Sequence, residues 1–235
     1  HASNGKIYGI TKRGGVINTN VLFEYDYNTN SISKKYDFNL AGANQLYPGG
    51  WIMEASNGKI YGTCLSGGTF DGGILYEYDY VLNIFTTKVN FGGSLGIDPF
   101  GGIVQASNGN LYTTVPHGGP SGSGGIIEYN LITDSVSMKH DFLASGLNAS
   151  RGSFIEIAPN KLYGLSVVGG ANDQGALYEY DCSTNQVTIL YDFTLATGNP
   201  TGSLLNASNG KLYGATTATT ATLGGLFEYD LATSA

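Results

Sequence analysis

Short apolar runs alternate with glycine-rich and polar stretches along the whole chain. A run such as ILYEYD at 74–79 places apolar and polar side chains in turn, and glycine or another turn-forming residue bounds it. This alternation is the pattern of a half-buried β-strand, whereas an amphipathic helix needs apolar residues at a period of about 3.6. No segment keeps the helical period, so the pattern predicts an all-β fold.

The runs are organised in a repeat of about 50 residues. The segment ASNGKIYG occurs at 2–9 and again at 55–62, and related segments follow three more times. The shared tyrosines show that successive repeats are offset by 53, 51, 51 and 50 residues. A period of about 20–50 residues indicates a solenoid, a propeller or a similar array. The tyrosines are Tyr8, Tyr61, Tyr112, Tyr163 and Tyr213.

Each repeat contains four strand-like pieces, which we name strands a to d. Strand a is an apolar piece such as 50–54, an Asn-Gly turn leads to strand b (59–62), strand c ends in EYD, and strand d is a piece such as 31–38. Four antiparallel strands per repeat form a propeller blade, with strand a innermost. The expected fold is a β-propeller of five blade-like units in a single domain over residues 1–235. Its repeats start near residues 1, 50, 101, 152 and 202.

The two end repeats are incomplete in this pattern. Residues 1–9 match the end of strand a and its turn, and the last residues stop where strand d of the fifth repeat is expected. The pattern therefore predicts 18 strands, two fewer than five complete blades need. Open sheet edges promote aggregation. We therefore expect the chain to be part of a longer array, or a partner chain or further blades to complete the ring.

The order of these strands carries a family resemblance. An apolar strand after Gly-Gly, then KIYG or KLYG, then a Tyr-Asp strand is similar to a kelch-type propeller blade. The whole chain resembles more closely a family of bacterial extracellular tandem repeats built on GSLLQASNGKLYGLTSGGG…GGVLFEYD. This resemblance implies an extracellular or cell-surface propeller, in a family mostly known as surface repeats of unassigned role. The kelch tryptophan after the Tyr-Asp strand is missing, so the resemblance does not extend to enzymatic kelch proteins.

Charged residues that recur in four of the five repeats predict ion pairs between strands b and c. A lysine at the start of strand b lies about 20 residues before an aspartate at the end of strand c. Residues at these positions face each other in an antiparallel pair. In the third repeat both residues are asparagine, as expected because an unpaired half-buried charge is costly. The pairs are Lys6/Asp26, Lys59/Asp79, Asn110/Asn130, Lys161/Asp181 and Lys211/Asp230.

The same register places a tyrosine of strand b opposite a glutamate of strand c in each repeat, for example Tyr163 and Glu179. We interpret these glutamates as structural hydrogen-bond acceptors; the alternative is a multivalent lectin with one site per blade. A second polar column ends strand a. It either braces the Asn-Gly turns or lines a central channel for water, a cation or a polar ligand. Its members are His1, Glu54, Gln105, Glu156 and Asn206.

Composition and charge exclude several classes of protein. The chain has 11 basic and 18 acidic residues, a net charge of −7 and no basic cluster larger than a pair. A nucleic-acid-binding surface needs a positive patch, so nucleic acid is excluded as a partner. No apolar run approaches the ~18 residues of a membrane helix, so membrane insertion is not expected. Cys64 and Cys182 are expected to be buried free thiols, and no metal site or cofactor is expected.

The candidate binding residues lie where the repeats differ. The b–c and d–a connections are long and variable, whereas the a–b and c–d turns are short and uniform. Binding residues are frequent on variable loops that a rigid scaffold holds in place. The ligand-binding candidates are therefore unrepeated side chains at this rim, with Trp51 as the main anchor. They are Trp51, Asp71, His117, Arg151 and Asp173.

No catalytic signature accompanies these residues. The sialidase Asp-box, Gly-x-Ser-x-Gly and a phosphate-binding loop are absent, and His140 replaces a repeated tyrosine as part of the scaffold. The expected function is a secreted or cell-surface binding module, without catalysis, for a glycan or a surface protein. The alternatives are a glycan-active propeller enzyme (hydrolase or lyase) and a passive structural repeat of a large surface protein.

Overall fold

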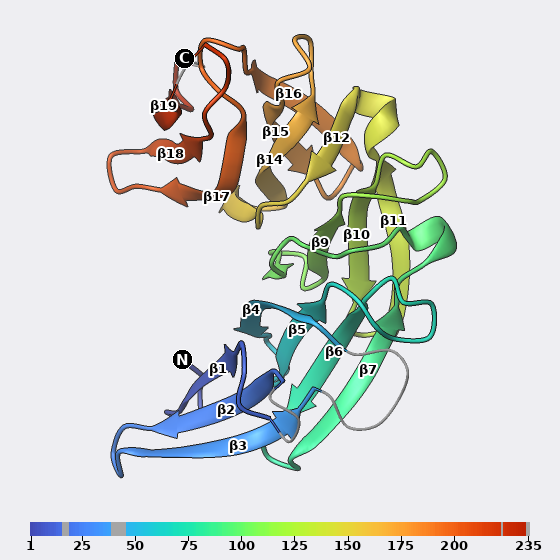
Figure 1. Cartoon of the computed structure of the whole chain (residues 1–235), viewed down its shortest axis with the longest axis vertical. Helices are drawn as coiled ribbons and strands as arrows, with labels where there is room; N and C mark the ends of the chain where they lie inside the picture. Colours follow the sequence, from blue (N-terminus) through green and yellow to red (C-terminus); the bar gives the residue numbers. More distant parts are fainter. Residues whose placement is uncertain (16–18, 39–45, 222, 234–235) are drawn as a thin grey trace. The chain divides into compact units, whose positions relative to one another are not determined.

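The computed structural model describes residues 1–15, 19–38, 46–221 and 223–233 of the chain. Within these ranges the chain forms strands β1 to β19 and two short 3-10 helices, η1 (Gly93–Leu95) and η2 (Phe142–Ser145) (Figure 1). The strands form five sheets in which every neighbouring pair is antiparallel. The expectation of an all-β fold built from repeated antiparallel sheets is confirmed.

The five sheets follow one another along the chain, and we number them accordingly. Sheet 1 contains β1 (Ile7–Thr11), β2 (Val21–Asp26) and β3 (Ser31–Asp37). Sheet 2 contains β4 (Pro48–Glu54), β5 (Ile60–Cys64), β6 (Ile74–Asp79) and β7 (Ile84–Asn90). Sheet 3 contains β8 (Val104–Gln105), β9 (Leu111–Val115), β10 (Gly125–Asn130) and β11 (Ser135–Asp141). Sheet 4 contains β12 (Leu147–Ser150), β13 (Ile155–Ala158), β14 (Lys161–Gly169), β15 (Ala176–Asp181) and β16 (Gln186–Asp192). Sheet 5 contains β17 (Pro200–Asn206), β18 (Lys211–Thr216) and β19 (Gly225–Asp230).

Sheet 4 has five strands because its strand a is interrupted. Both β12 and β13 pair with the long strand β14, and Arg151 lies between them. In sheet 2 the equivalent strand β4 is continuous, but its pairing with β5 jumps from Pro48↔Cys64 to Ile52↔Gly62. The extra residues of such a bulge leave the ladder and re-aim their side chains. Strand a therefore carries an irregular segment that presents side chains outside the regular pairing.

The two kinds of short turn are set by local chemistry. In the a–b turn of sheet 2, Gly58 has a φ of +72°, a conformation that glycine adopts without steric cost. In the c–d turn that follows, the Asp79 carboxylate accepts hydrogen bonds from the backbone N–H groups of Val81 and Leu82, both at 2.9 Å. Asn83 then ends the turn with a φ of +57°. These repeated turns fix the strand order within each sheet.

The contacts divide the chain into two compact units. The first unit comprises His1–Gly92 and Ile97–Ile103, and the second comprises Gly93–Gly96 and Val104–Ala235. In the first unit the core lies between sheets 1 and 2, where Leu22 and Phe38 pack with Tyr76. In the second unit one core joins sheets 3 and 4, and another joins sheets 4 and 5. A single domain over the whole chain stays a prediction.

Strand c uses its two faces differently. Leu177 of β15 is fully buried against sheet 5 with Leu204 and Leu212. The next residue, Tyr178, is fully buried on the other face, against Phe142 of η2 and Tyr112 of sheet 3. Strand b makes room for this ring with Gly164, because a Cβ there would lie only 2.7 Å from Tyr178 Oη. Strand c of sheet 4 thus offers a leucine to the following sheet and an aromatic ring to the preceding one.

Candidate functional site

A hydrogen-bond network joins the a–b turn to strands b and c. In sheet 2 the Asn57 side-chain amide donates to Tyr61 Oη at 2.9 Å, and Tyr61 donates to the Glu77 carboxylate. The register Tyr61↔Glu77 is the predicted one, and Tyr8↔Glu24, Tyr112↔Glu128, Tyr163↔Glu179 and Tyr213↔Glu228 repeat it. Burial, and then the hydrogen bond to Glu179, raise the pKa of Tyr163. Tyr163 therefore stays protonated as a donor, which supports the structural interpretation of Glu179.

A lysine completes the network, and the structure shows that it comes from two different strands. In sheet 4 Lys161 of strand b lies 2.8 Å from Glu179. In sheet 3, where strand b has Asn110 instead, Lys139 of strand d lies 2.9 Å from Glu128. Sheet 1 also uses strand d, through Lys35 at 3.1 Å from Glu24. Sheet 3 has therefore not simply lost a charge pair, because its glutamate keeps a lysine partner supplied by another strand.

Sheet 3 also shows how the network controls ionisation. Burial opposes the ionisation of Glu128, but the hydrogen bonds from Tyr112 and Lys139 outweigh it and hold the pKa of this carboxyl below its ordinary value. The glutamate is thus an anion with its acceptor sites occupied. An occupied anion of this kind is suited to a scaffold, since a general acid or a sugar-binding carboxylate needs an accessible oxygen.

The predicted lysine–aspartate pairs are present with one difference. Lys161 lies 2.9 Å from Asp181, Lys59 lies 3.6 Å from Asp79, and Lys6 pairs with Asp26. In sheet 5 the register Lys211↔Asp230 is as predicted, but the Lys211 ammonium forms its ion pair with Glu228. The aspartates also cap the c–d turns through their second oxygen, as Asp181 does for Ser183. This second role explains why asparagine can replace aspartate in sheet 3.

Three members of the polar column at the end of strand a brace Asn-Gly turns, which is one of the two interpretations of this column. Gln105 donates to the carbonyl of Gly109 in its own turn at 2.8 Å. Glu54 accepts from the backbone N–H of Ser3 in sheet 1 at 2.7 Å, and Glu156 accepts from Ser107 N–H in sheet 3 at 2.9 Å. The two glutamates therefore hold the turn of the preceding sheet within their own unit.

Asp71 and Asp173, two of the candidate binding residues, occupy equivalent places in the b–c loops of sheets 2 and 4. Both are exposed and have positive φ angles, 57° and 53°. The Asp71 carboxylate accepts from Gly67 N–H at 3.0 Å, and the Asp173 carboxylate accepts from Gly169 N–H at 3.1 Å. The prediction that these two residues are unrepeated is wrong, because they make the same contact at equivalent positions. One carboxylate oxygen of each closes its own loop.

The other three candidates lie on two kinds of segment. His117 is exposed in the b–c loop of sheet 3, next to a bridge between Gly118 and Ser123. Trp51 and Arg151 belong to the irregular segments of strand a in sheets 2 and 4, and both are exposed, Trp51 by 54%. Of the five candidates, Trp51 and Asp71 are in the first unit. The second unit contains His117, Arg151 and Asp173. One composite site made from all five stays a prediction.

Three further aromatic side chains are exposed in the connections of sheet 2. Phe70 of the b–c loop is exposed by 68%, Tyr47 before β4 by 46%, and Phe100 of the following connection by 44%. Their segments touch, because Leu65 N–H bonds to the Tyr47 carbonyl at 2.6 Å and Asp98 N–H bonds to the Gly72 carbonyl at 2.9 Å. We call Tyr47, Trp51, Phe70 and Phe100 the aromatic rim. Tyr47 did not emerge from the sequence, although it too is an aromatic residue at a connection that varies between repeats.

The part of the chain that the structure describes offers few reactive or metal-binding side chains besides these. Cys64 and Cys182 are buried free thiols, and burial raises the pKa of Cys182 to about 11. No three His, Cys, Asp or Glu side chains gather as metal ligands among the described residues. No described helix has the length and apolar character that a membrane crossing requires.

Comparison with known proteins identifies the fold. No curated protein matches the chain in sequence. TolB from Acinetobacter baumannii matches in structure with a TM-score of 0.58 and 18% identity, over 96% of this chain and 49% of TolB. The extracellular domain of a protein described as a hybrid two-component system from B. thetaiotaomicron matches with a TM-score of 0.66 and 17% identity, over 99% of this chain and 26% of that one. A chain of a nidogen/laminin complex matches with a TM-score of 0.57 and 14% identity, over 96% of this chain and 78% of that one.

These relatives are of β-propeller type, so the predicted fold class is confirmed. This chain spans about half of TolB and about a quarter of the B. thetaiotaomicron chain. The predicted number of five blade-like units stays a prediction. The family model of the Gloeobacter/Verrucomicrobia repeat matches residues 1–155 and again 47–235, which together cover the whole chain. This confirms that the chain consists of repeats of a bacterial family, whereas the similarity to kelch blades stays a prediction. The chain belongs to the Gloeobacter/Verrucomicrobia repeat family.

Proposed function

We propose that this protein is a secreted or cell-surface binding module that recognises a glycan through the aromatic rim of sheet 2. The observation that carries the proposal is the exposure of four aromatic side chains on segments that contact one another around β4 and β5. Exposed aromatic rings expose apolar surface to water, and such patches often mark interaction sites. An indole also offers a flat apolar face beside a polar N–H, which suits the face of a sugar ring.

The polar groups near the rim fit binding better than catalysis. Asp71 uses one carboxylate oxygen to close its own loop, and its other oxygen is left for a ligand hydroxyl. The glutamates of strand c are held in Tyr–Glu–Lys networks, so they do not support one sugar site per blade. His117, Arg151 and Asp173 of the second unit stay candidates for ligand binding.

The proposed location outside the cell has separate support. The B. thetaiotaomicron relative is described as an extracellular domain, although the likeness itself concerns the fold. The chain carries a net charge of −7 and no basic cluster, which disfavours polyanions such as nucleic acid and favours neutral partners. A neutral glycan, or a surface protein that carries one, is therefore the partner we propose.

The single tryptophan makes the proposal directly testable. The chain contains one Trp, so any change in indole emission on adding a ligand reports on the rim itself. The labelled protein is first screened on a glycan array, and each hit is titrated while Trp51 emission is recorded. Trp51→Ala should weaken binding about tenfold or more, because the stacked face is lost.

Tyr27→Ala is the matched control, because Tyr27 is an aromatic residue of similar exposure (50%) on a c–d turn of the same unit. It should bind as the unchanged protein does. An array without hits would favour the passive structural repeat, and binding that survives Trp51→Ala would place the site elsewhere. Hydrolysis or elimination products from a bound glycan would favour the enzyme.

A further inference from the structure

The a–b turn contains the dipeptide Asn-Gly in four of the five repeats. These dipeptides are Asn4-Gly5, Asn57-Gly58, Asn108-Gly109 and Asn209-Gly210. Asn-Gly is chemically unstable in an unfolded chain, because glycine has no Cβ to shield its backbone nitrogen from the asparagine side-chain carbonyl carbon. In the fourth repeat Asn160 is followed by Lys161 instead. The same reactive dipeptide therefore recurs in four turns and is absent from one.

In the turn of sheet 2, hydrogen bonds hold both groups that would react. The Gly58 N–H donates to the Ala55 carbonyl at 2.9 Å. The Asn57 side-chain amide donates to Tyr61 Oη at 2.9 Å, and its oxygen accepts from the Lys59 N–H at 3.2 Å. A covalent attack needs the two reacting atoms aligned at about 3–3.5 Å. Rotation of the Asn57 amide toward the Gly58 nitrogen breaks the hydrogen bonds that hold the amide.

The turn of sheet 3 has the same arrangement. The Gly109 N–H donates to the Ala106 carbonyl at 2.8 Å, and the Asn108 side-chain amide donates to Tyr112 Oη at 2.8 Å. Tyr112 and its equivalent Tyr61 are each only 1% exposed. Neither ring can swing away from its asparagine while the surrounding sheet is intact. The tyrosine is therefore the fixed partner that holds the asparagine of each turn.

The glutamate of strand c decides which side chain the tyrosine accepts. Tyr61 donates its only proton to the Glu77 carboxylate, so its oxygen is left as an acceptor for Asn57. An amide fits this place, because its NH2 group is a donor. A carboxylate at position 57 has no proton to donate and brings a second negative charge toward Glu77. The network therefore stabilises asparagine but not its hydrolysed form.

We propose that Asn57 and Asn108 are modification sites, at which the chain converts itself to aspartate and isoaspartate with water as the only co-reactant. The buried tyrosine of each turn, Tyr61 or Tyr112, holds this reaction off while its sheet is intact. The reaction starts only when a turn opens locally and its asparagine leaves the tyrosine. Each of the two turns thereby keeps a permanent record of having opened.

The bonds that form and break explain why the change is permanent. In the opened turn the Gly58 nitrogen bonds to Asn57 Cγ, the bond between Cγ and Nδ2 breaks, and the proton of the Gly58 nitrogen ends on the ammonia that leaves. The product is a five-membered succinimide. Water then opens this ring at either carbonyl, which gives aspartate or isoaspartate. Because neither product can donate to Tyr61, the turn does not regain its original hydrogen bond.

The test incubates the intact chain at mildly alkaline pH, where the backbone nitrogen loses its proton more easily. Peptide mapping by mass spectrometry then gives the rate of conversion at each asparagine. In the folded protein Asn57 and Asn108 should convert at least about a hundredfold more slowly than in the same chain unfolded in guanidinium chloride. Asn160, which precedes a lysine, is the negative control and should convert slowly in both states. Equal rates at Asn57 in the folded and unfolded chain would overturn the proposal.

Two reciprocal variants separate the role of each tyrosine from a general loss of stability. Tyr61→Phe should raise the rate at Asn57 severalfold, up to about tenfold, because one hydrogen bond to the amide is lost. The rate at Asn108 should stay unchanged in this variant. Tyr112→Phe should have the opposite pattern. Acceleration at both asparagines by one variant, or at neither, would overturn the proposal.

Lys59→Met is the matched control within sheet 2. It removes the ion pair between the Lys59 ammonium and Glu77, 3.0 Å apart, but keeps the Tyr61 hydroxyl and the backbone N–H that bonds to Asn57. The rate at Asn57 should therefore remain that of the unchanged protein. If Lys59→Met accelerated the reaction as much as Tyr61→Phe does, loosening of the sheet would be the cause and the role of Tyr61 would be refuted.

Discussion

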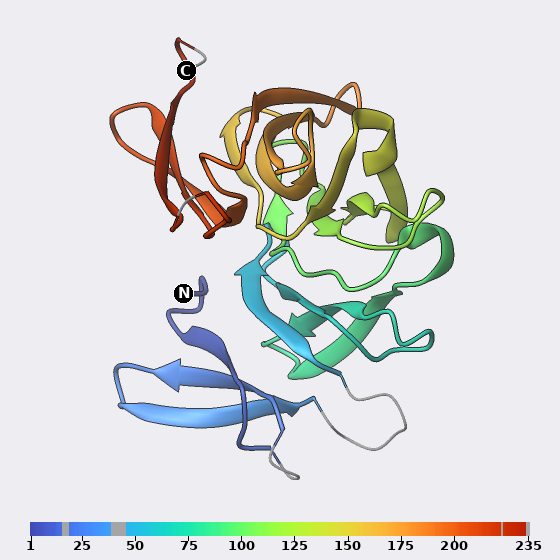
Figure 2. The same cartoon turned by 45° about the horizontal axis from the view of Figure 1, so that its top comes forward.

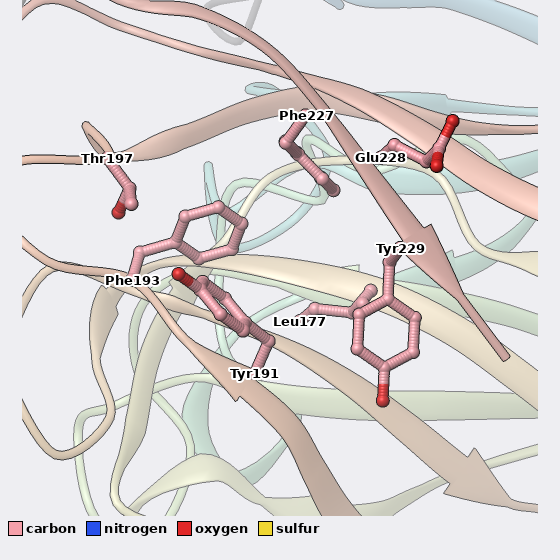
Figure 3. A pocket seen from close by; sticks show the side chains of 7 residues that line it. All are labelled: Leu177, Tyr191, Phe193, Thr197, Phe227, Glu228 and Tyr229. Atoms are coloured by element: carbon pink, nitrogen blue, oxygen red, sulfur yellow. The ribbon is translucent and has the colours of Figure 1, made fainter. Parts of the chain in front are cut away.

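Two interfaces of the molecule are built from the same wall of aromatic rings but differ in what closes them. Between sheets 1 and 2 the rings of Tyr36, Phe38 and Tyr76 surround Phe85 of β7. Between sheets 4 and 5 the rings of Tyr191, Phe193 and Phe227 surround a cavity (Figure 3). Figures 1 and 2 show that β7 lies along the outer edge of its sheet, where sheet 5 ends at β19. The two interfaces thus share an aromatic wall and differ in whether a ring of strand d fills the space that the wall encloses.

The largest expected difference concerns backbone opening at the two strands c. Strand β15 is paired on both sides, by β14 and β16, whereas β19 is paired only with β18 among the described residues. In a protein of these 235 residues, the β19 amides that point away from β18 should exchange with deuterium at least about a hundredfold faster than those of β15. The amides that join β18 and β19 serve as the internal control and should remain slower. Equal protection of β15 and β19 would contradict the comparison.

The second difference concerns the residue that fills the first interface. Phe85→Ala removes a half-buried ring from a close-packed aromatic cluster, so it should cost about 2–4 kcal/mol of unfolding free energy. Tyr191→Ala removes a ring whose neighbour is already a cavity, so it should cost less than about 1.5 kcal/mol. Urea unfolding is followed by Trp51 emission, which reports on the first unit, and by circular dichroism, which reports on the whole chain. Equal losses would mean that the cavity wall is as tightly packed as the filled interface.

The smallest expected difference concerns the glutamates of strand c. Glu128→Gln leaves Lys139 without its anionic partner in a half-buried place, and should cost about 1–2 kcal/mol. Glu228→Gln removes an exposed carboxylate, so its effect should be clearly smaller. The measurement is urea unfolding by circular dichroism at neutral pH. A larger loss for Glu228→Gln would show that exposure does not govern the strength of these pairs.

Acid titration sharpens this third prediction. The networks lower the pKa of Glu128, so its stabilising contribution is fully present above the unfolded-state pKa of about 4.3 and is lost as the pH falls through the lower folded-state pKa. The hydrogen bond from Lys6 likewise lowers the pKa of Asp26 to about 2. Stability should therefore decrease on acidification from about pH 5 toward pH 2. Glu128→Gln should flatten this decrease.

The register of the b–c pairs could be predicted without a structure because the repeat supplies its own comparison. A recurring separation between Lys161 and Asp181, and between their equivalents, has one geometric solution in an antiparallel pair joined by a loop. The Tyr163–Glu179 hydrogen bond follows from the same register. The exposed position of Trp51 at a variable connection was likewise readable from the repeat, since other repeats have glycine or serine there.

The sequence by itself determined the period, the antiparallel strands and the pairs between neighbouring strands b and c, because these depend on residues that are close along the chain. Only the tertiary structure decided that Lys139 replaces the missing lysine of sheet 3, that Asp71 and Asp173 close equivalent loops, and that the wall around Tyr191 is left open. Each of these depends on which side chain another strand or the next sheet brings to the same place. Hydrophobic alternation indicates that a residue is buried, but it does not indicate which neighbouring residue covers it.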